Sequence, residues 1–154
     1  MIQEIKQIKG QNLIDLELTP YNFVMSLTEL DDNDDEAIID KVKEYLQLSK
    51  IDVPSNNYYV VGVWQYMINQ LTKLMDLRKN LSDDTPNVDL IQAGAHMLQN
   101  LGYMVELMQL AQGDYIKALQ LAELPYHQIY WLSYYTKVNN TITENYRKII
   151  EKKK

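Results

Sequence analysis

The sequence predicts a mainly α-helical protein, a bundle of five or six helices with a small N-terminal β element. Leu, Met and Tyr recur at helical spacing through most of residues 58–150. Residues 14–18 instead alternate apolar with acidic side chains, the period of a half-buried strand. At 154 residues one domain is expected over residues 1–154, with a β-like segment over 1–18 and a helical bundle over 19–154.

The β prediction rests on the first 18 residues. Ile14, Leu16 and Leu18 alternate with Asp15 and Glu17, and the sequence KGQN just before them is typical of a turn, so a hairpin with residues 4–8 is expected. An isolated hairpin is marginal in water. These strands are therefore expected to lie on the helices or to pair with another chain.

Two short helices are expected next. Thr19 is suited to cap a helix that has Pro20 at its first position and runs to Leu30. The acidic run over 31–36 places negative charge at the positive end of a second helix. The apolar positions of that second helix share one face: Ile38, Ile39, Val42, Tyr45 and Leu46.

Two longer helices are expected in the middle of the chain. Ser55 or Asn56 caps a third helix of about 24 residues, and a polar connection over 82–87 precedes a fourth helix from Val88 to about residue 111. The third helix has an apolar stripe of Val60, Trp64, Met67, Leu71, Leu74 and Leu81. Gly94 and Gly102 of the fourth helix lie on nearly one face, which predicts close approach of a neighbouring helix.

The last third of the sequence predicts a short helix followed by a long one. Gly113 ends the fourth helix and Asp114 caps a fifth that runs to Leu121, while Pro125 begins the final helix. The apolar positions of the final helix are Tyr126, Ile129, Tyr130, Tyr134, Val138, Ile142, Tyr146 and Ile149. Lysines near its end suit the negative end of the helix dipole.

Composition narrows the functional classes. The net charge of -6 disfavours nucleic acid, whose binding needs clustered Lys and Arg. The absence of cysteine removes disulfides, thiolate metal sites and thiol nucleophiles. The most apolar long segment, residues 88–111, is interrupted by polar and charged side chains, so no membrane span is expected. Without an apolar secretory core near Met1, the chain is expected to be cytoplasmic.

The acidic run over 31–36 resembles a calcium loop only at its start. Asp31, Asn33 and Asp35 occupy the first three ligand positions, but Glu36 stands where a glycine is needed, and Val42 where a bidentate Glu is needed. A solvated helix start is the expected structure, and no metal site is predicted.

Other chemical signatures are equally weak. His96 and His127 do not form a ligand pair, and the glycines do not form a phosphate loop. A carboxylate site such as Glu106 with Asp114 would have to be assembled by folding. The sequence therefore predicts a protein without catalytic residues or cofactor, not an enzyme.

Twelve tyrosines and one phenylalanine make the aromatic composition unusual. Tyr and Trp combine large apolar area with a polar group and are enriched at interfaces. The candidate contact residues are Tyr126, Tyr130, Trp131, Tyr134 and Tyr135 of the final helix, with Ile14, Leu16 and Leu18 as a strand edge for pairing. The alternative is that Tyr replaces Phe in an ordinary core and its rim.

The layout of the chain resembles that of small tail-assembly proteins of tailed bacteriophages. The resemblance lies in three segments, LELTPYNF at 16–23, GDYIKAL at 113–119 and LPYHQIY at 124–130, and in the basic helical tail. It implies a tail-assembly chaperone, which shields the long apolar helical tape-measure protein and recruits tail-tube subunits without a cofactor. The partners would be tail or virion proteins, and a second copy of the chain is also considered.

Two alternatives stay open. The first is a structural virion, baseplate or connector component that forms an oligomer and stays in the particle, which the tyrosine-rich final helix favours. The second is a small cytoplasmic ligand-binding or enzymatic helical domain. That alternative predicts a deep cavity around His96 or His127 with converging polar groups.

Overall fold

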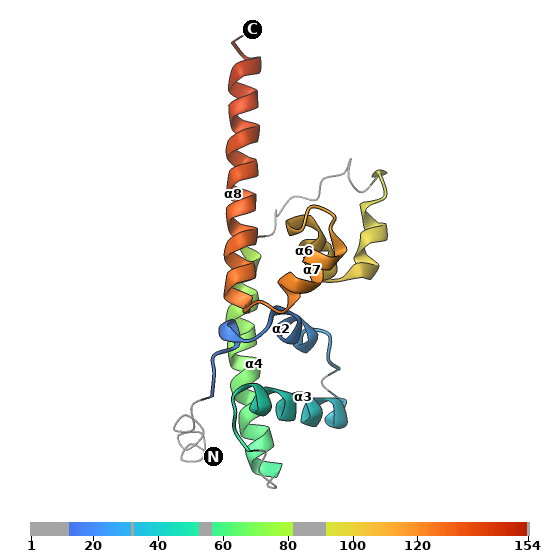
Figure 1. The fold of residues 1–154 in the computed structure, drawn as a ribbon, viewed down its shortest axis with the longest axis vertical. Helices are drawn as coiled ribbons and strands as arrows, with labels where there is room; N and C mark the ends of the chain where they lie inside the picture. Colours follow the sequence, from blue (N-terminus) through green and yellow to red (C-terminus); the bar gives the residue numbers. More distant parts are fainter. Residues whose placement is uncertain (1–12, 32, 53–56, 82–91, 154) are drawn as a thin grey trace.

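A computed structural model describes residues 13–31, 33–52, 57–81 and 92–153, and these residues are mainly helical, as expected (Figure 1). The elements, in chain order, are η1 (Leu16–Leu18), α2 (Tyr21–Leu27), α3 (Asp35–Leu48), α4 (Asn57–Lys79), η2 (Ala95–Leu101), α6 (Met104–Leu110), α7 (Tyr115–Ala122) and α8 (Tyr126–Glu151). The two η elements are 3-10 helices. No helix of the described residues combines the length and hydropathy needed to cross a membrane.

The strand expected over residues 14–18 is wrong, because Leu16–Leu18 forms a 3-10 helix. The buried Leu16 side chain belongs to the core, and its N–H donates to Gln70 Oε1 of α4 at 2.7 Å rather than to a neighbouring strand. Tyr45 of α3 donates its hydroxyl to the Ile14 carbonyl. The first expected strand and the turn, residues 4–12, lie outside the described residues.

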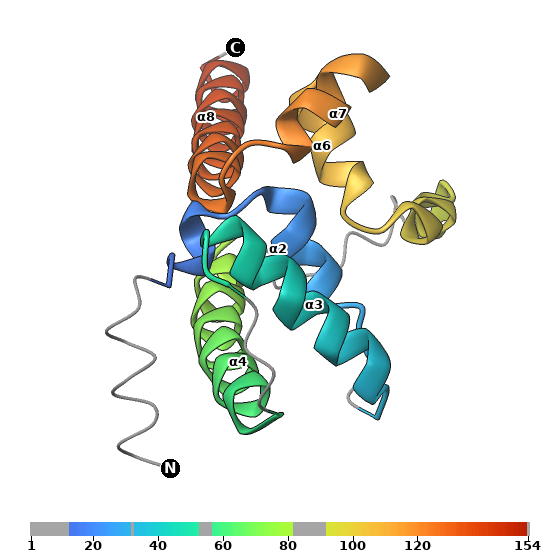
Figure 2. The ribbon, with the colours of Figure 1, turned by 60° about the horizontal axis from the view of Figure 1, so that its bottom comes forward.

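The short helix α2 lies at the centre of the molecule, between α3 and α4 on one side and α7 and α8 on the other (Figure 2). Its apolar side chains Tyr21, Phe23, Val24 and Leu27 are all buried. The ring of Phe23 stacks on Tyr45 of α3, with centroids 6.2 Å apart. A seven-residue helix thus contacts both halves of the core.

The starts of α2 and α8 are joined through their backbones. Tyr21 N–H donates to the Leu124 carbonyl at 2.8 Å, and Tyr126 N–H donates to the Thr19 carbonyl at 2.9 Å. Thr19 is not the cap that the sequence predicts, because its buried hydroxyl donates to the Leu16 carbonyl at 2.7 Å. Instead, Pro20 stands at the N-cap of α2.

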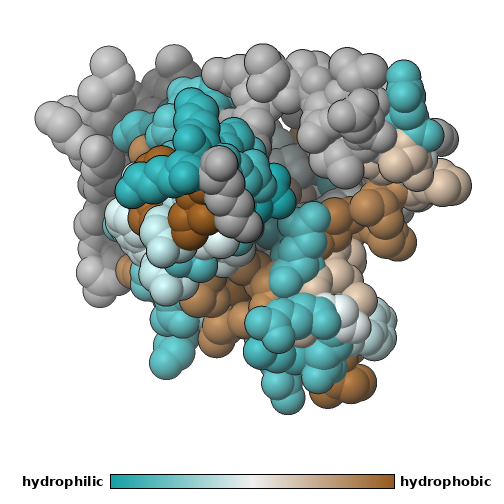
Figure 3. Space-filling model, turned by 90° about the horizontal axis from the view of Figure 1, so that it is seen from above, coloured by the Kyte–Doolittle hydropathy of each residue, from teal (hydrophilic) through white to brown (hydrophobic). Residues whose placement is uncertain are grey.

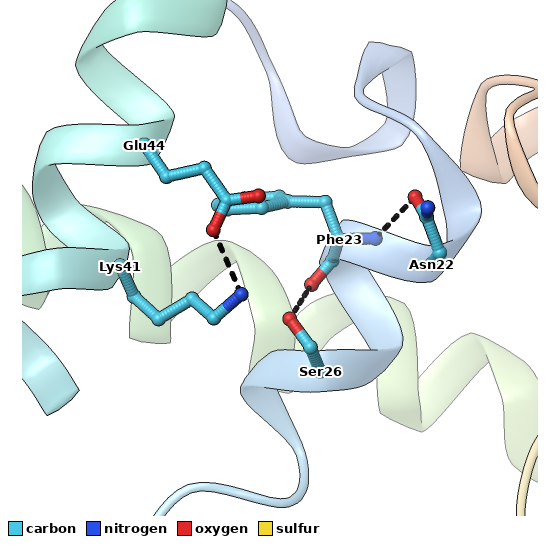
Figure 4. A network of polar contacts seen from close by, with 5 residues as sticks. All are labelled: Asn22, Phe23, Ser26, Lys41 and Glu44. Carbon is cyan, nitrogen blue, oxygen red and sulfur yellow. Dashed lines mark hydrogen bonds and ion pairs between the residues drawn. The ribbon is translucent and has the colours of Figure 1, made fainter.

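The acidic run before α3 does begin a helix. Asp34 caps it by accepting from the Ala37 N–H at 3.0 Å. Farther along α3, where it contacts α2, Lys41 lies over the Phe23 ring, 5.4 Å from its centroid. Lys41 also pairs with Glu44 at 2.8 Å (Figure 4). Cations are attracted to the face of an aromatic ring, so Lys41 covers the edge of this apolar contact.

The apolar stripe expected for α4 is confirmed as part of the core except at Leu81, which lies after the helix ends, and Val60 and Trp64 are half-buried there. Met67, Leu71 and Leu74 are buried, and Val63 joins them. The cap expected at residue 55 or 56 and the connection over 82–87 lie outside the described residues.

The single fourth helix expected over 88–111 is wrong. In the described part of this range the chain forms the 3-10 helix η2 and then the short helix α6. Gly94 has φ +95° and Gly102 has φ +51°, a left-handed conformation that an α-helix does not contain. Both glycines therefore mark turns, rather than the helix contact that their spacing predicts.

The fifth and last helices begin where the sequence predicts. Asp114 caps α7 by accepting from the Lys117 N–H at 3.1 Å, and α8 begins directly after Pro125. At 1.5 Å per residue the 26 residues of α8 are about 39 Å long. Only Tyr126 and Ile129 of this helix are buried, and its second half projects beyond the other helices (Figure 1).

Candidate protein-interaction site

The first turns of α8 are held firmly against the body of the protein. Tyr126 and Ile129 are buried, and the Tyr126 ring stacks on Tyr21 of α2 with centroids 5.7 Å apart. The 3-10 helix η1 also contacts α8, since His127 Nδ1 lies 2.9 Å from the Glu17 carbonyl oxygen. These contacts fix the direction in which the rest of α8 leaves the body.

Glu106 of α6 extends this anchorage with a partly buried polar network. Its carboxylate accepts hydrogen bonds from the Tyr21 hydroxyl, from Arg78 Nη2 and from the Ser133 hydroxyl. The Arg78 guanidinium also lies over the Tyr21 ring, 5.7 Å from its centroid. One carboxylate thereby joins α2, α4, α6 and α8.

The surroundings of Tyr21 and Arg78 in this network keep both groups protonated. Burial, helped by the carboxylate of Glu106, raises the pKa of Tyr21 well above its usual value, so the phenol stays neutral and donates a hydrogen bond to Glu106. Burial alone would lower the pKa of Arg78, but the interactions with Glu106, Tyr21 and Tyr126 together outweigh burial, so the pKa is raised. The network therefore consists of the neutral phenol of Tyr21 beside the ion pair of Arg78 and Glu106.

A polar groove of about 450 Å³ runs beside this network, between the end of α4, α6 and α8. The side of α8 that lines it carries Ser133, Thr136, Lys137, Asn140, Thr141 and Glu144. Lys137 Nζ donates to the Asn80 carbonyl at the end of α4, at 3.1 Å. The face of α8 that lies toward the body is therefore its polar face.

The apolar face of α8 points the other way. We call it the outer stripe, and it consists of Trp131, Tyr135, Val138, Ile142, Tyr146 and Ile149. At about 100° per residue, its members lie within about 80° of one another and about 170° from the centre of Ser133, Thr136, Asn140 and Glu144. Their side chains are 38–68% exposed. Seen from the end at which α8 finishes, hydrophobic residues are exposed between hydrophilic ones (Figure 3).

The structure divides the contact residues that the sequence predicts into three groups. Tyr126 and Leu16 are buried within the subunit, so they are core residues rather than contact residues. Tyr130 and Ile14 are half-buried. The exposed ones are Trp131, Tyr134, Tyr135 and Leu18. Because η1 is not a strand, Leu18 offers no strand edge for pairing.

Four members of the outer stripe were not among the predicted contact residues: Val138, Ile142, Tyr146 and Ile149. Their helical spacing is evident in the sequence, but that spacing alone is equally typical of a face buried against the protein's own core. What distinguishes them is that the polar row of α8 lies toward the body, which the structure shows and the spacing does not.

The other chemical candidates have structural roles. Asp31 accepts hydrogen bonds from the backbone and side chain of Asn33, at 3.0 and 2.9 Å, which lowers the pKa of its carboxyl. Glu106 belongs to the polar network and Asp114 caps α7, so each has a separate partner. The polar groove beside α8 does not include His127. Within the described ranges, no group of three or more His, Cys, Asp or Glu residues is placed to hold a metal ion.

In comparisons with known proteins, no family model, no curated protein and no solved structure matches this chain.

Proposed function

We propose that this chain is a non-enzymatic assembly factor that binds other proteins through the outer stripe of α8. One observation supports this most: α8 directs its polar face into its own groove and its apolar face to solvent. Surface helices ordinarily do the reverse and bury the apolar face. Exposed contiguous apolar surface of this size typically marks a site of protein contact.

The partner best suited to the outer stripe is an amphipathic helix of another protein. Apolar side chains at spacings of three and four residues form a continuous row about 27 Å long, which matches the way that one helix contacts another. Trp131, Tyr135 and Tyr146 supply the large aromatic area that dominates binding at such contacts.

The specific form of this proposal is a phage tail-assembly chaperone, acting in the host cytoplasm. It rests on the layout of the chain and on the fit between a row of exposed apolar side chains and a long apolar helical client. The large aromatic area also favours the second candidate, a structural virion component that stays in the particle, because stable interfaces are rich in Tyr and Trp.

Co-expression with the tape-measure protein encoded in the same genome tests the proposal. The wild-type chain should raise the soluble yield of that protein and co-purify with it, whereas Ile142→Glu should do neither. Thr143→Glu is the matched control, because it adds the same charge one residue away at an exposed position off the stripe. Equal yields with wild type and Ile142→Glu would contradict the proposal. A source genome that lacks tail genes would contradict its specific form, the phage tail-assembly chaperone.

The finished particle distinguishes the two candidates. A chaperone should be absent from purified particles, whereas a structural component should be present there in fixed stoichiometry.

A further inference from the structure

We infer that, in the free protein, the outer stripe of α8 is covered by the α8 helix of a second copy, paired antiparallel about a two-fold axis near residue 140. This inference rests on the proposed function, because it names a partner for the same surface. A binding partner would then have to displace the second copy.

The register of the outer stripe is self-complementary. In a two-fold antiparallel pair, residues whose numbers sum to 280 lie opposite one another. Trp131 then faces Ile149, and Val138 faces Ile142, while Tyr135 lies within one residue of the level of the partner's Tyr146. Successive members are 4, 3, 4, 4 and 3 residues apart. This averages 3.6 residues per turn, so the stripe stays on one side of a straight helix over its whole length.

The second copy would also fill a groove on the first. A hollow of about 580 Å³ runs along one edge of the stripe, and it is lined by Asn80 just after α4 and by Tyr130, Trp131, Tyr134, Lys137, Val138, Thr141 and Ile142 of α8. In the register above, the partner's Ile149 lies opposite Trp131, on the edge of the stripe that borders this hollow. Its side chain would enter the hollow, so the pair has a concave seat as well as a row of contacts.

The area is sufficient for a stable dimer. A fully exposed Tyr or Trp presents about 200 Å², and Trp131, Tyr135 and Tyr146 are 60–68% exposed. With the three aliphatic residues, the outer stripe offers about 600 Å² per copy, or about 1,200 Å² for the pair, which reaches the lower end of the range of stable interfaces. Exposed Leu132, Tyr134 and Ile150 beside the stripe extend it.

Charge favours the antiparallel orientation over the parallel one. The last turns of α8 and the residues after it carry clustered cations, Arg147, Lys148, Lys152 and Lys153, of which the first two pair with Glu151 and Glu144 of the same helix. A parallel pair would place both clusters side by side. An antiparallel pair separates them by more than 20 Å along α8, well beyond the Debye length of about 8 Å at physiological ionic strength. The positions that immediately flank the stripe, such as Asn139 and Thr141, are uncharged and add no repulsion.

Light scattering coupled to size-exclusion chromatography, over a dilution series of the full chain, tests the pairing. We expect a dimer for wild type and for Thr143→Glu. Ile142→Glu should raise the dissociation constant at least about 100-fold, because each copy would bury an unpaired carboxylate in the contact. Circular dichroism should show the same helical content for all three. A monomeric wild type, or a dimer that Ile142→Glu leaves intact, would overturn the inference.

Orientation is tested by oxidative crosslinking, which native thiols do not complicate because the chain lacks cysteine. An equimolar mixture of Trp131→Cys and Ile149→Cys should form a disulfide that joins residue 131 of one copy to residue 149 of the other. Disulfides that join 149 to 149 would overturn the antiparallel pairing.

Failure of this inference is distinguishable from failure of the proposed function. A monomeric protein whose binding to the tape-measure protein is still lost in Ile142→Glu would overturn the dimer and support the proposed function. Conversely, a dimer that dissociates in Ile142→Glu while this binding persists would support the dimer and overturn the outer stripe as the site for other proteins.

Discussion

Substitution of Glu106 by Gln should destabilise the whole fold, because one carboxylate joins four helices. Gln keeps the shape but removes the charge that faces Arg78, whose side chain is only 24% exposed. Hydrogen bonds to charged groups contribute about 1.5–3 kcal/mol, and breaking a fully buried pair costs about 3–5 kcal/mol. Since this pair is partly exposed, we expect a loss of about 2 kcal/mol and a Tm about 4–8 °C lower.

Urea denaturation followed by far-UV circular dichroism measures this loss. Glu123→Gln is the matched control, because its exposed carboxylate accepts one hydrogen bond, from Asn22 at 3.0 Å. That control should stay within about 0.5 kcal/mol of wild type. A double-mutant cycle with Arg78→Met should give a coupling energy of about 1–2 kcal/mol. Additive effects, or a loss in Glu106→Gln no larger than in the control, would refute the reasoning.

Three further predictions concern the core, one turn and alkaline pH. Ile129→Ala should lower the free energy of unfolding by about 3 kcal/mol, because it leaves a cavity beneath the anchored start of α8. Thermal denaturation measures this loss, and a change below about 1 kcal/mol would show that the start of α8 is not tightly packed. Gly113→Ala should lower the free energy of unfolding by about 1–2 kcal/mol, because Gly113 has φ +86°, which strains a residue with a side chain, while its surroundings leave room for a methyl group. An unchanged midpoint of urea denaturation would show that the backbone at this turn is not strained by alanine. Burial raises the pKa of Tyr21, Tyr45 and Tyr126 above the ordinary 10.0, so these phenols ionise first in the unfolded chain. The stability is therefore complete below pH of about 10 and falls above it, by up to about 1.4 kcal/mol per pH unit for each tyrosine, and a free energy of unfolding that stays constant above that pH would contradict this.

Most helices could be predicted because their limits are set locally. Asp34 and Asp114 accept hydrogen bonds from the first turns of α3 and α7, and the prolines before α2 and α8 fix the backbone at each start. The buried stripe of α4 likewise follows from helical spacing. Signals of this kind act over three or four residues, and the sequence displays them directly.

Two local patterns were misleading. The alternation around Leu16 has the period of a strand, but without a neighbouring strand its backbone bonds to Gln70 of α4 instead. Gly94 and Gly102 have the spacing of a helix contact, yet both adopt positive φ and break the helix. For Leu16 the competing conformation depends on a residue 54 positions away, which no local window contains.

The candidate site was only partly predictable for the same reason. The sequence indicated that the last helix is rich in aromatic residues and has more than one apolar row. It gave no sign that Glu106 would meet Tyr21, Arg78 and Ser133, because these residues are 27 to 85 positions away along the chain.

The sequence by itself determined that this protein is mainly helical, where most of its helices begin, and that the last helix carries apolar side chains in more than one row. Only the tertiary structure decided which face of α8 meets the body. An amphipathic pattern records two faces but not their neighbours. Here Arg78 of α4 and Glu106 of α6 present polar groups, so Ser133 bonds to Glu106, the polar row of α8 lines the groove beside them, and the apolar row is left outside.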